Sequence, residues 1–228
     1  MSGISYVLAG GTGEYIEKKS RFIGSLRPVM SQEEASAFLQ ETRKAHHDAR
    51  HHCMAWIIGE DGQMKHSSDD GEPSGTAGRP ILSVMEGAHL ANAALIVTRY
   101  FGGTLLGTGG LVRAYTAAAQ AALNDAEIVT PRPAFTGNMT LTYSQWPAVQ
   151  AFFRKQDVFV TGVSYGSDVS LTLAAGLESE SSLLSGLEAI LKVSAPVTER
   201  RLCQIAAAQD ALLLFDESGL HRLPVTSL

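Results

Sequence analysis

A polar stretch at residues 67–80 constrains the fold of this chain more than any other feature. It holds three carboxylates, three glycines and two prolines, and it has no large apolar side chain. Such a stretch cannot form a core strand or a core helix, so it predicts a long loop between two buried elements. A loop of this length inside a compact domain is typically either functional or disordered. A second glycine-rich segment at residues 101–110, together with five histidines between His46 and His66, predicts one site assembled from separated pieces.

The bulk composition limits the class of protein. A chain of 228 residues with 45% hydrophobic residues has room for one domain or two. No apolar run approaches the ~20 residues of a membrane span, and the N-terminus lacks the pattern of a signal peptide. We interpret Cys53 and Cys203, in strand-like runs of different halves, as reduced thiols of a cytoplasmic protein. The net charge of -5 argues against a surface wrapped in nucleic acid, but not against a local basic groove.

The first half of the chain is predicted to alternate strands and helices. Ser31 and Glu34 form a capping box that opens a helix over residues 32–45. The nearly continuous apolar run at residues 95–97 predicts a strand that is buried on both faces. The remaining patterns predict further elements: strands at 20–29, 52–59, 64–66 and 93–100, helices at 80–90 and 110–124, and a hairpin at Asp61-Gly62.

The prolines at residues 130–133 predict a linker between two domains. We therefore expect an α+β chain with a first domain over 1–130, a second over 134–207 and a tail over 208–228. Within the tail, only residues 212–215 have the pattern of an edge strand. The order strand-helix-strand-strand-helix-strand is the split βαβ, or ferredoxin-like, pattern. It is predicted from strands at 135–143, 158–165, 169–175 and 198–206 and helices at 146–156 and 178–192.

The histidine cluster at residues 46–53 is the first candidate site. Imidazole and thiol groups, with the carboxylates of the acidic stretch, suggest a zinc or iron site of a hydrolase. The spacing is poor, however, because adjacent His51 and His52 in a strand point to opposite faces. The other interpretation is that one histidine of each pair packs or caps while the other is solvated. We assign no metal ligand, no catalytic residue and no cofactor, and keep a metal-dependent hydrolase as an alternative.

The glycine-rich segment is the second candidate site. A strand, then glycines, then a helix presents backbone N–H groups to an anion. Thr108 stands where a nucleotide-hydrolysing phosphate loop needs lysine, so that activity is disfavoured. Bidentate guanidinium contacts suit phosphates, and the predicted anion- or nucleic-acid-binding set is Lys18, Lys19, Arg21, Arg79, Arg99, Gly102, Gly103, Gly107, Gly109, Gly110 and Arg113.

Each of these features has a structural alternative. The glycines suit close packing of a helix on a sheet equally well. Arg79, Arg99 and Arg113 can instead pair with Asp69, Asp70 and Glu72 and hold the acidic loop in place, which would explain how so acidic a loop stays ordered.

Four motifs of this chain resemble the IMPACT/YigZ family over about residues 14–125. They lie at residues 18–23, at 49–56, at 68–78 and at 99–115, in the expected order. The second half resembles the ferredoxin-like domain of bacterial members, itself similar to the last domain of elongation factor G. The resemblance implies that the first domain has the fold of ribosomal protein S5 domain 2, and it implies no settled chemistry.

The eukaryotic relatives implied by this resemblance regulate translation by competing for a ribosome-associated activator of a starvation kinase. They carry an N-terminal RWD domain for that interaction. This chain begins almost directly at the first motif, so we expect that the kinase-linked role does not carry over. What carries over is a motif-lined cleft that meets RNA, a ribosome or a translation-related protein.

We therefore expect a non-enzymatic binding protein that acts in translation regulation, with no membrane partner and no small-molecule ligand that the sequence identifies. The motif cleft would comprise Arg50, His51, His52, Asp69, Asp70, Glu72 and Thr76. A pure protein-interaction scaffold is the other alternative, which an exposed apolar patch on the second sheet would favour. The main hypothesis requires that the acidic and glycine-rich loops converge on one partly cationic hollow.

Overall fold

The computed structural model describes residues 3–59, 62–194, 196–208, 211–216 and 219–226. Asp61 of the predicted hairpin lies outside these residues. The chain divides into two compact α+β units, Met1–Thr130 and Pro131–Leu228, and each is described by itself. None of the helices in the described ranges has the length and apolar character that crossing a membrane requires.

Unit 1 is built on an antiparallel sheet of five strands in the order β2-β3-β7-β4-β5. The central strand β7 is buried along nearly its whole length, which confirms the prediction of two covered faces. The bounds are β2 (Gly11–Glu17), β3 (Ser20–Pro28), β7 (Ala93–Tyr100), β4 (His51–Ile58) and β5 (Met64–Ser68). A smaller sheet joins β6 (Leu90–Ala91), β1 (Ser5–Ala9) and β8 (Glu127–Val129).

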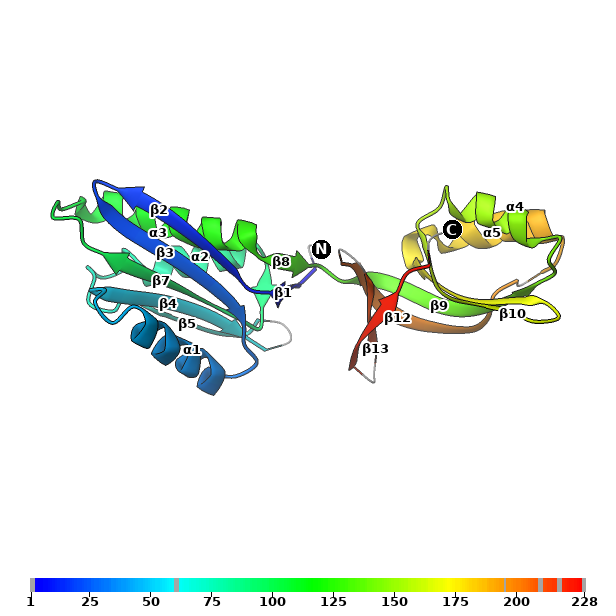
Figure 1. The fold of residues 1–228 in the computed structure, drawn as a ribbon, viewed down its shortest axis with the longest axis horizontal. Helices are drawn as coiled ribbons and strands as arrows, with labels where there is room; N and C mark the ends of the chain where they lie inside the picture. The colour runs from blue at the N-terminus through cyan, green and yellow to red at the C-terminus, as the bar shows by residue number, and fades with distance from the viewer. Residues whose placement is uncertain (1–2, 60–61, 195, 209–210, 217–218, 227–228) are drawn as a thin grey trace. The chain divides into compact units, whose positions relative to one another are not determined.

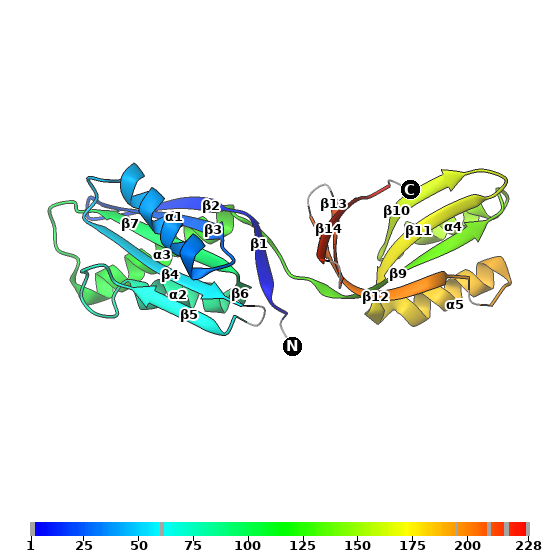
Figure 2. The ribbon, with the colours of Figure 1, turned by 90° about the horizontal axis from the view of Figure 1, so that it is seen from below.

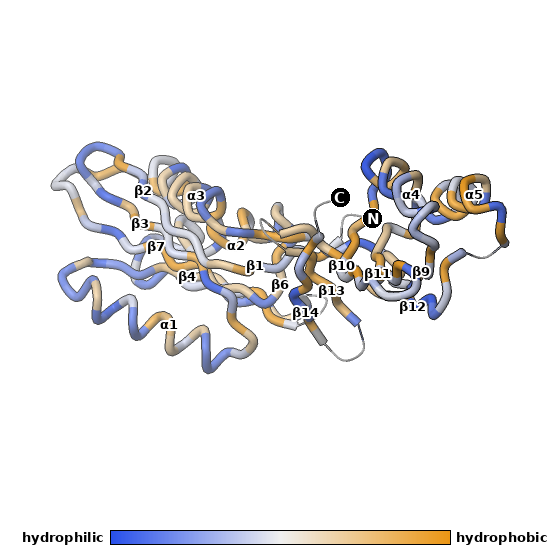
Figure 3. The backbone as a smooth tube through the Cα atoms, turned by 45° about the vertical axis from the view of Figure 1, so that its right-hand side comes forward, coloured by the Kyte–Doolittle hydropathy of each residue, from blue (hydrophilic) through white to orange (hydrophobic). Residues whose placement is uncertain are grey.

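Helix α1 (Gln32–Ala45) covers one face of the larger sheet, while α2 (Gly78–Gly87) and α3 (Gly107–Asp125) cover the other (Figure 1). α1 has the predicted bounds because Ser31 Oγ accepts the Glu34 N–H, and Glu34 Oε2 accepts the Met30 N–H rather than that of Ser31. Hydrophobic and hydrophilic residues alternate along its turns (Figure 3), which places Phe38 against the sheet. α2 ends three residues before the predicted Leu90, which belongs to β6.

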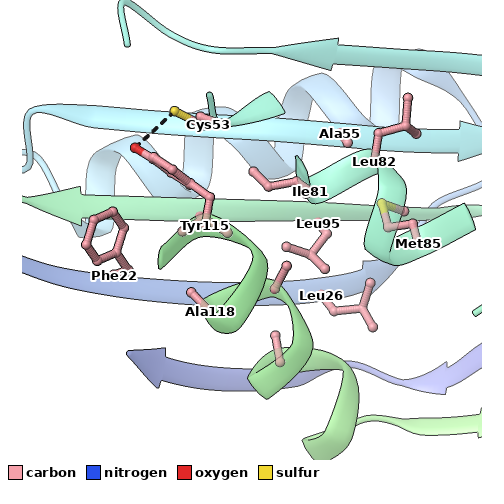
Figure 4. Close-up of a cluster of buried hydrophobic side chains, with 14 of the residues drawn as sticks. Phe22, Leu26, Cys53, Ala55, Ile81, Leu82, Met85, Leu95, Tyr115 and Ala118 are labelled. Carbon is pink, nitrogen blue, oxygen red and sulfur yellow. Dashed lines mark hydrogen bonds between the residues drawn. The ribbon is translucent and has the colours of Figure 1, made fainter. Parts of the chain in front are cut away.

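Helix α3 lies unusually close to strands β2 and β3. A Cβ on Gly24 would stand 2.4 Å from the Ala118 carbonyl oxygen, and one on Gly13 would stand 2.4 Å from the Ala121 carbonyl carbon. Tyr115 and Ala118 on α3 point into the same hydrophobic core as Phe22 (Figure 4). The glycines of these two strands therefore allow the helix to pack closely on the sheet.

Unit 2 has an antiparallel sheet in the order β10-β11-β9-β12-β13-β14. Figure 2 shows β10, β11 and β9 side by side, and Figure 1 shows α4 and α5 on one face of the sheet. The elements follow the predicted order: β9 (Arg132–Leu141), α4 (Trp146–Phe153), β10 (Val158–Tyr165), β11 (Val169–Gly176), a 3₁₀ turn (Leu177–Ser179), α5 (Glu180–Leu191) and β12 (Thr198–Ala207).

Two further strands, β13 (Ala211–Asp216) and β14 (Gly219–Pro224), extend this sheet, where the sequence had indicated only a single edge strand at residues 212–215. Leu212 packs with Ala134 and Ile205 on the sheet face opposite α4 and α5. The Thr226 N–H then donates to the Val160 carbonyl oxygen at 2.8 Å. The segment that was predicted as a tail therefore covers part of the sheet face opposite α4 and α5.

The rest of this face is polar. A hollow of about 500 Å³ is lined mainly by hydroxyl and amide side chains, among them Asn138, Thr140, Ser170 and Thr172. Exposed large hydrophobic residues on the described strands of this sheet include Tyr165, Leu202 and Leu220.

Candidate functional site

The acidic loop, defined here as residues 69–77, is held in place by its first carboxylate. Asp69 Oδ1 accepts hydrogen bonds from the N–H groups of Ala77 (3.0 Å) and Gly78 (2.8 Å), and Oδ2 accepts one from Gly75 (2.8 Å). Burial raises the pKa of Asp69, but these three bonds outweigh burial and leave the pKa below its ordinary value. Because Ala77 offers no side-chain cap, Asp69 also caps the N-terminus of α2.

Asp70 is engaged just as fully. Its carboxylate accepts a hydrogen bond from the His52 N–H at 2.7 Å and pairs with Arg43 Nη2 at 2.6 Å. Its carbonyl oxygen accepts a hydrogen bond from His51 Nδ1 at 2.8 Å. The carboxylates of Asp69 and Asp70 are therefore both bound by groups of unit 1 and stabilise the loop. Glu72 carries the third carboxylate of the loop.

Glu72 forms a buried ion pair with Arg99, the next-to-last residue of β7. Arg99 Nη1 lies 2.5 Å from Glu72 Oε1, and the two side chains are only 6% and 4% exposed. The Tyr115 hydroxyl donates to the same carboxylate oxygen at 2.8 Å. Loop, central strand and α3 are thus joined at one carboxylate.

Cys53 on β4 completes this buried network. Its Sγ lies 3.3 Å from the Tyr115 hydroxyl, the contact drawn in Figure 4, and 3.0 Å from the Asp69 carbonyl oxygen. Burial raises the pKa of the Cys53 thiol to about 12, although the Tyr115 hydrogen bond lowers it. Because the thiolate is the nucleophilic form, this cysteine is suited to packing rather than to covalent catalysis.

The acidic loop and the glycine-rich segment meet in a cavity of about 370 Å³, here called the loop pocket. Arg50 and Arg99 give it cationic walls, whereas Phe101, Leu105 and Leu106 give it apolar ones. Its full lining is Arg50, His51, Gly71, Glu72, Pro73, Arg99, Phe101, Leu105, Leu106, Gly107, Thr108 and Leu111. The two loops that the main hypothesis required to converge do so here.

Phe101 stands at this pocket as an accessible ring. The residue is 42% exposed, and the guanidinium carbons of Arg99 and Arg50 lie 5.5 and 6.0 Å from the ring centre. Leu105 is 82% exposed beside it. An exposed aromatic ring between two guanidinium groups can stack a planar ligand and hold its negative charge at the same time.

The glycine-rich segment also touches the turn between β2 and β3. The Gly102 N–H donates to Ser20 Oγ at 3.1 Å, and a Cβ on Gly102 would stand 2.1 Å from the Lys19 carbonyl carbon. Lys18 and Lys19 are exposed in this turn. The close approach explains why glycine is needed at residue 102, and it brings two lysines next to the segment.

The other predicted residues are distributed differently. Arg79 lines a separate cavity of about 470 Å³ with residues of α2 and α3, and Arg113 is exposed on α3. Arg21 pairs with Glu14 at 2.8 Å. Thr76 bonds the Pro73 carbonyl oxygen, Gly103 and Gly107 adopt left-handed φ values, and Gly109 and Gly110 lie in the first turns of α3.

The interpretation in which arginines hold the acidic loop is right for Arg99 alone. Neither Arg79 nor Arg113 forms an ion pair with any part of the chain that the structure describes, and the second cation on the loop is Arg43. Arg43 lies in the last turn of α1, where the sequence gives no sign that it reaches Asp70.

Two histidine rings of the predicted cluster are bonded to backbone carbonyl groups. His51 Nδ1 is used by the Asp70 carbonyl, and His52 Nε2 lies 3.1 Å from the His46 carbonyl oxygen. Burial of His52 lowers its pKa, although the His46 hydrogen bond opposes this. Across the described ranges, no three His, Cys, Asp or Glu side chains are placed to hold an ion together.

Several residues of the site were missed from the sequence. Phe101 carried a signal, because an aromatic ring next to two glycines in a polar loop has no core to enter. Tyr115 and Leu111 lie four residues apart on α3 and so share a face. For Pro73, Leu105 and Leu106 no local signal separates a pocket wall from an ordinary loop.

Comparison with known proteins identifies the family to which this chain is related. The model of the Impact N-terminal domain matches residues 18–123, and that of a domain of unknown function, DUF1949, matches residues 139–184. IMPACT family member YigZ of Escherichia coli (strain K12) is 40% identical over 159 residues, covering 69% of this chain and 78% of the relative. IMPACT family member YvyE of Bacillus subtilis (strain 168) is 36% identical over 163 residues, with 72% and 75% covered.

A crystal structure described as that of a hypothetical protein superposes with a TM-score of 0.53 at 34% identity, covering 89% of this chain and 97% of the other. The matches span both units, and the first family model covers all the residues that line the loop pocket. On these grounds the chain belongs to the IMPACT family.

Proposed function

We propose that this chain is a non-enzymatic binding protein that acts in translation, and that unit 1 contacts single-stranded RNA at the loop pocket. The observation that carries the proposal is Phe101, an exposed ring flanked by the guanidinium groups of Arg50 and Arg99. Proteins that bind single-stranded RNA combine aromatic side chains, on which bases stack, with cations that follow the backbone. Arg50 at the ring is exposed, and so are Lys18 and Lys19, whose turn contacts Gly102 next to the ring.

The state of the polar groups favours binding over catalysis. Asp69 and Asp70 are saturated by backbone and side-chain donors. The Cys53 thiol has a pKa too high for a nucleophile at neutral pH. A cleft whose carboxylates and thiol hold its own walls is suited to recognition.

The family supports the setting of translation. Membership in the IMPACT family carries the expectation of relatives that regulate translation. We extend the proposal to the folds, with unit 1 as a ribosomal protein S5 domain 2-like domain and unit 2 as a ferredoxin-like domain, whose strand and helix order suits that name. Unpaired Cys53 and Cys203 fit a reducing, cytoplasmic location.

The test is the affinity of the full chain for a fluorescent single-stranded RNA, measured by anisotropy at several salt concentrations. Phe101→Ala should weaken binding about 5- to 150-fold, because stacking of a base contributes ~1–3 kcal/mol. Arg50→Ala should weaken binding and reduce the slope of log affinity against log salt by about 1, if it contacts a phosphate.

Arg27→Ala is the matched control. Arg27 also lies over a ring, that of Phe38 at 4.5 Å, and pairs with Glu41, but it is not part of the loop pocket. The Arg27→Ala variant should bind RNA with the same affinity as the unchanged chain. If all three variants bound RNA with the affinity of the unchanged chain, the proposed site would be overturned. Crosslinking of RNA only to residues 131–228 would instead place recognition in unit 2.

A further inference from the structure

One buried donor in the loop pocket is without a partner. Arg99 Nη1 is bound to Glu72, but Arg99 Nε has no hydrogen-bond partner among the described residues, although the side chain is only 6% exposed. Leaving a buried N–H group unpaired costs ~1–3 kcal/mol. A buried donor without a protein partner calls for an acceptor that the chain does not supply, such as a water or a ligand, and Arg99 lines the cavity in which a ligand can lie.

The N-terminus of α3 faces the same cavity. The side chain of Leu106, the N-cap residue, accepts no hydrogen bond, so it leaves the first N–H groups of this 19-residue helix uncapped. Gly107 and Thr108 line the pocket, and a Cβ added to Gly107 would meet nothing within 4 Å. Free N–H groups at a helix N-terminus bind anions, and the open space lets an anion approach the backbone.

The charges of the pocket have the matching sign. Arg50 and Arg99 contribute two positive charges and Glu72 one negative charge. Glu72 Oε1 is shared by Arg99 Nη1 and the Tyr115 hydroxyl, so the carboxylate is occupied on the protein side. The pocket therefore favours an anion, with the free donors of Arg99 and α3 as its ligands.

The size and walls restrict what carries the anion. A volume of about 370 Å³ lies in the range of small-ligand sites. The exposed ring of Phe101 suits a flat aromatic group, and Leu105 and Leu111 complete an apolar wall. Arg99 lines the pocket with a side chain that is only 6% exposed, so a group that reaches its donors has to be narrow, which suits a terminal phosphate better than a phosphate with chain on both sides.

We infer that the loop pocket binds a nucleoside monophosphate group, with its phosphate on Arg99 and the N-terminus of α3 and its base on Phe101. The group could come from a free nucleotide or from the 5′-phosphorylated end of an RNA. The inference deepens the proposed function. Binding of a 5′-phosphorylated RNA end rests on that proposed function, whereas binding of a free nucleotide does not.

The experiment uses the full chain and three probes: an RNA with a 5′-phosphate, the same RNA with a 5′-hydroxyl, and AMP. The phosphorylated RNA should bind at least tenfold more tightly than the hydroxyl form, and AMP should compete with it. Thr108→Glu should abolish both effects, because its carboxylate would lie at the proposed phosphate position, and acidic residues are favourable in the first turn of a helix.

Thr116→Glu is the matched control. Thr116 is also an exposed threonine of α3 but lies outside the loop pocket, so this variant adds the same charge and should keep both effects. Equal affinity for the two RNA ends with no AMP binding would overturn the inference and leave RNA binding intact. AMP binding that Thr108→Glu abolishes, without any added affinity from RNA, would support the inference and overturn the RNA proposal.

Discussion

Glu72 and Arg99 link the acidic loop to the centre of the sheet through a pair of charges that are almost completely buried. Removing one partner of such a pair leaves the other charge uncompensated, at a cost of ~3–5 kcal/mol. We expect Glu72→Gln to lower the free energy of unfolding by about this amount, measured by urea denaturation.

Glu14→Gln is the control for this change, because Glu14 and Arg21 form an exposed pair on β2 and β3. Exposed pairs contribute only ~0–1 kcal/mol, so this variant should be nearly neutral. Similar losses in both variants would show that the Glu72 carboxylate does not stabilise Arg99.

The packing of α3 on β2 and β3 depends on glycine in the strands. A Cβ at Gly24 would stand 2.4 Å from the backbone oxygen of Ala118, so helix and strand would have to separate. We expect Gly24→Ala to lower the free energy of unfolding by ~1–3 kcal/mol, the usual cost of overpacking. The measurement is again denaturation, with tyrosine and tryptophan fluorescence as the signal.

Gly87→Ala makes the same chemical change where there is space. Gly87 ends α2, and an added Cβ would meet nothing within 4 Å. Since alanine favours a helix by up to ~1 kcal/mol over glycine, this variant should be neutral or slightly stabilised. If Gly24→Ala were equally neutral, close packing of α3 would not be the reason for glycine at that position.

Each of the two units has its own core. Phe22, Leu95 and Tyr115 belong to a cluster made only of unit 1 residues, and Phe135 and Leu187 belong to one made only of unit 2 residues. We therefore expect residues 1–130 prepared alone to unfold cooperatively and to bind RNA as the full chain does. Circular dichroism melting and anisotropy test this, with residues 131–228 as the comparison. A fragment 1–130 without a cooperative transition would contradict independent folding.

Local chemistry made several elements predictable. α1 has the predicted bounds because Ser31 and Glu34 act on N–H groups within the same turn. β7 was predicted because a run of apolar residues can be recognised without knowing what covers it. By contrast, no strand was predicted before Ser20, and β2 forms there through glycines whose role becomes apparent only when α3 packs on them.

Local patterns in the sequence were enough to predict most of the helices and strands between Ser20 and Ala207, the family motifs and the polar, glycine-rich character of the two loops. These depend on caps, periodicity and turn residues, which act between neighbours along the chain. The pairing of Glu72 with Arg99 rather than with Arg79 or Arg113, and that of Arg43 with Asp70, became known only from the folded chain. Both partnerships join residues 27 positions apart, so they are decided by how α1, β7 and the acidic loop pack, which no local pattern encodes.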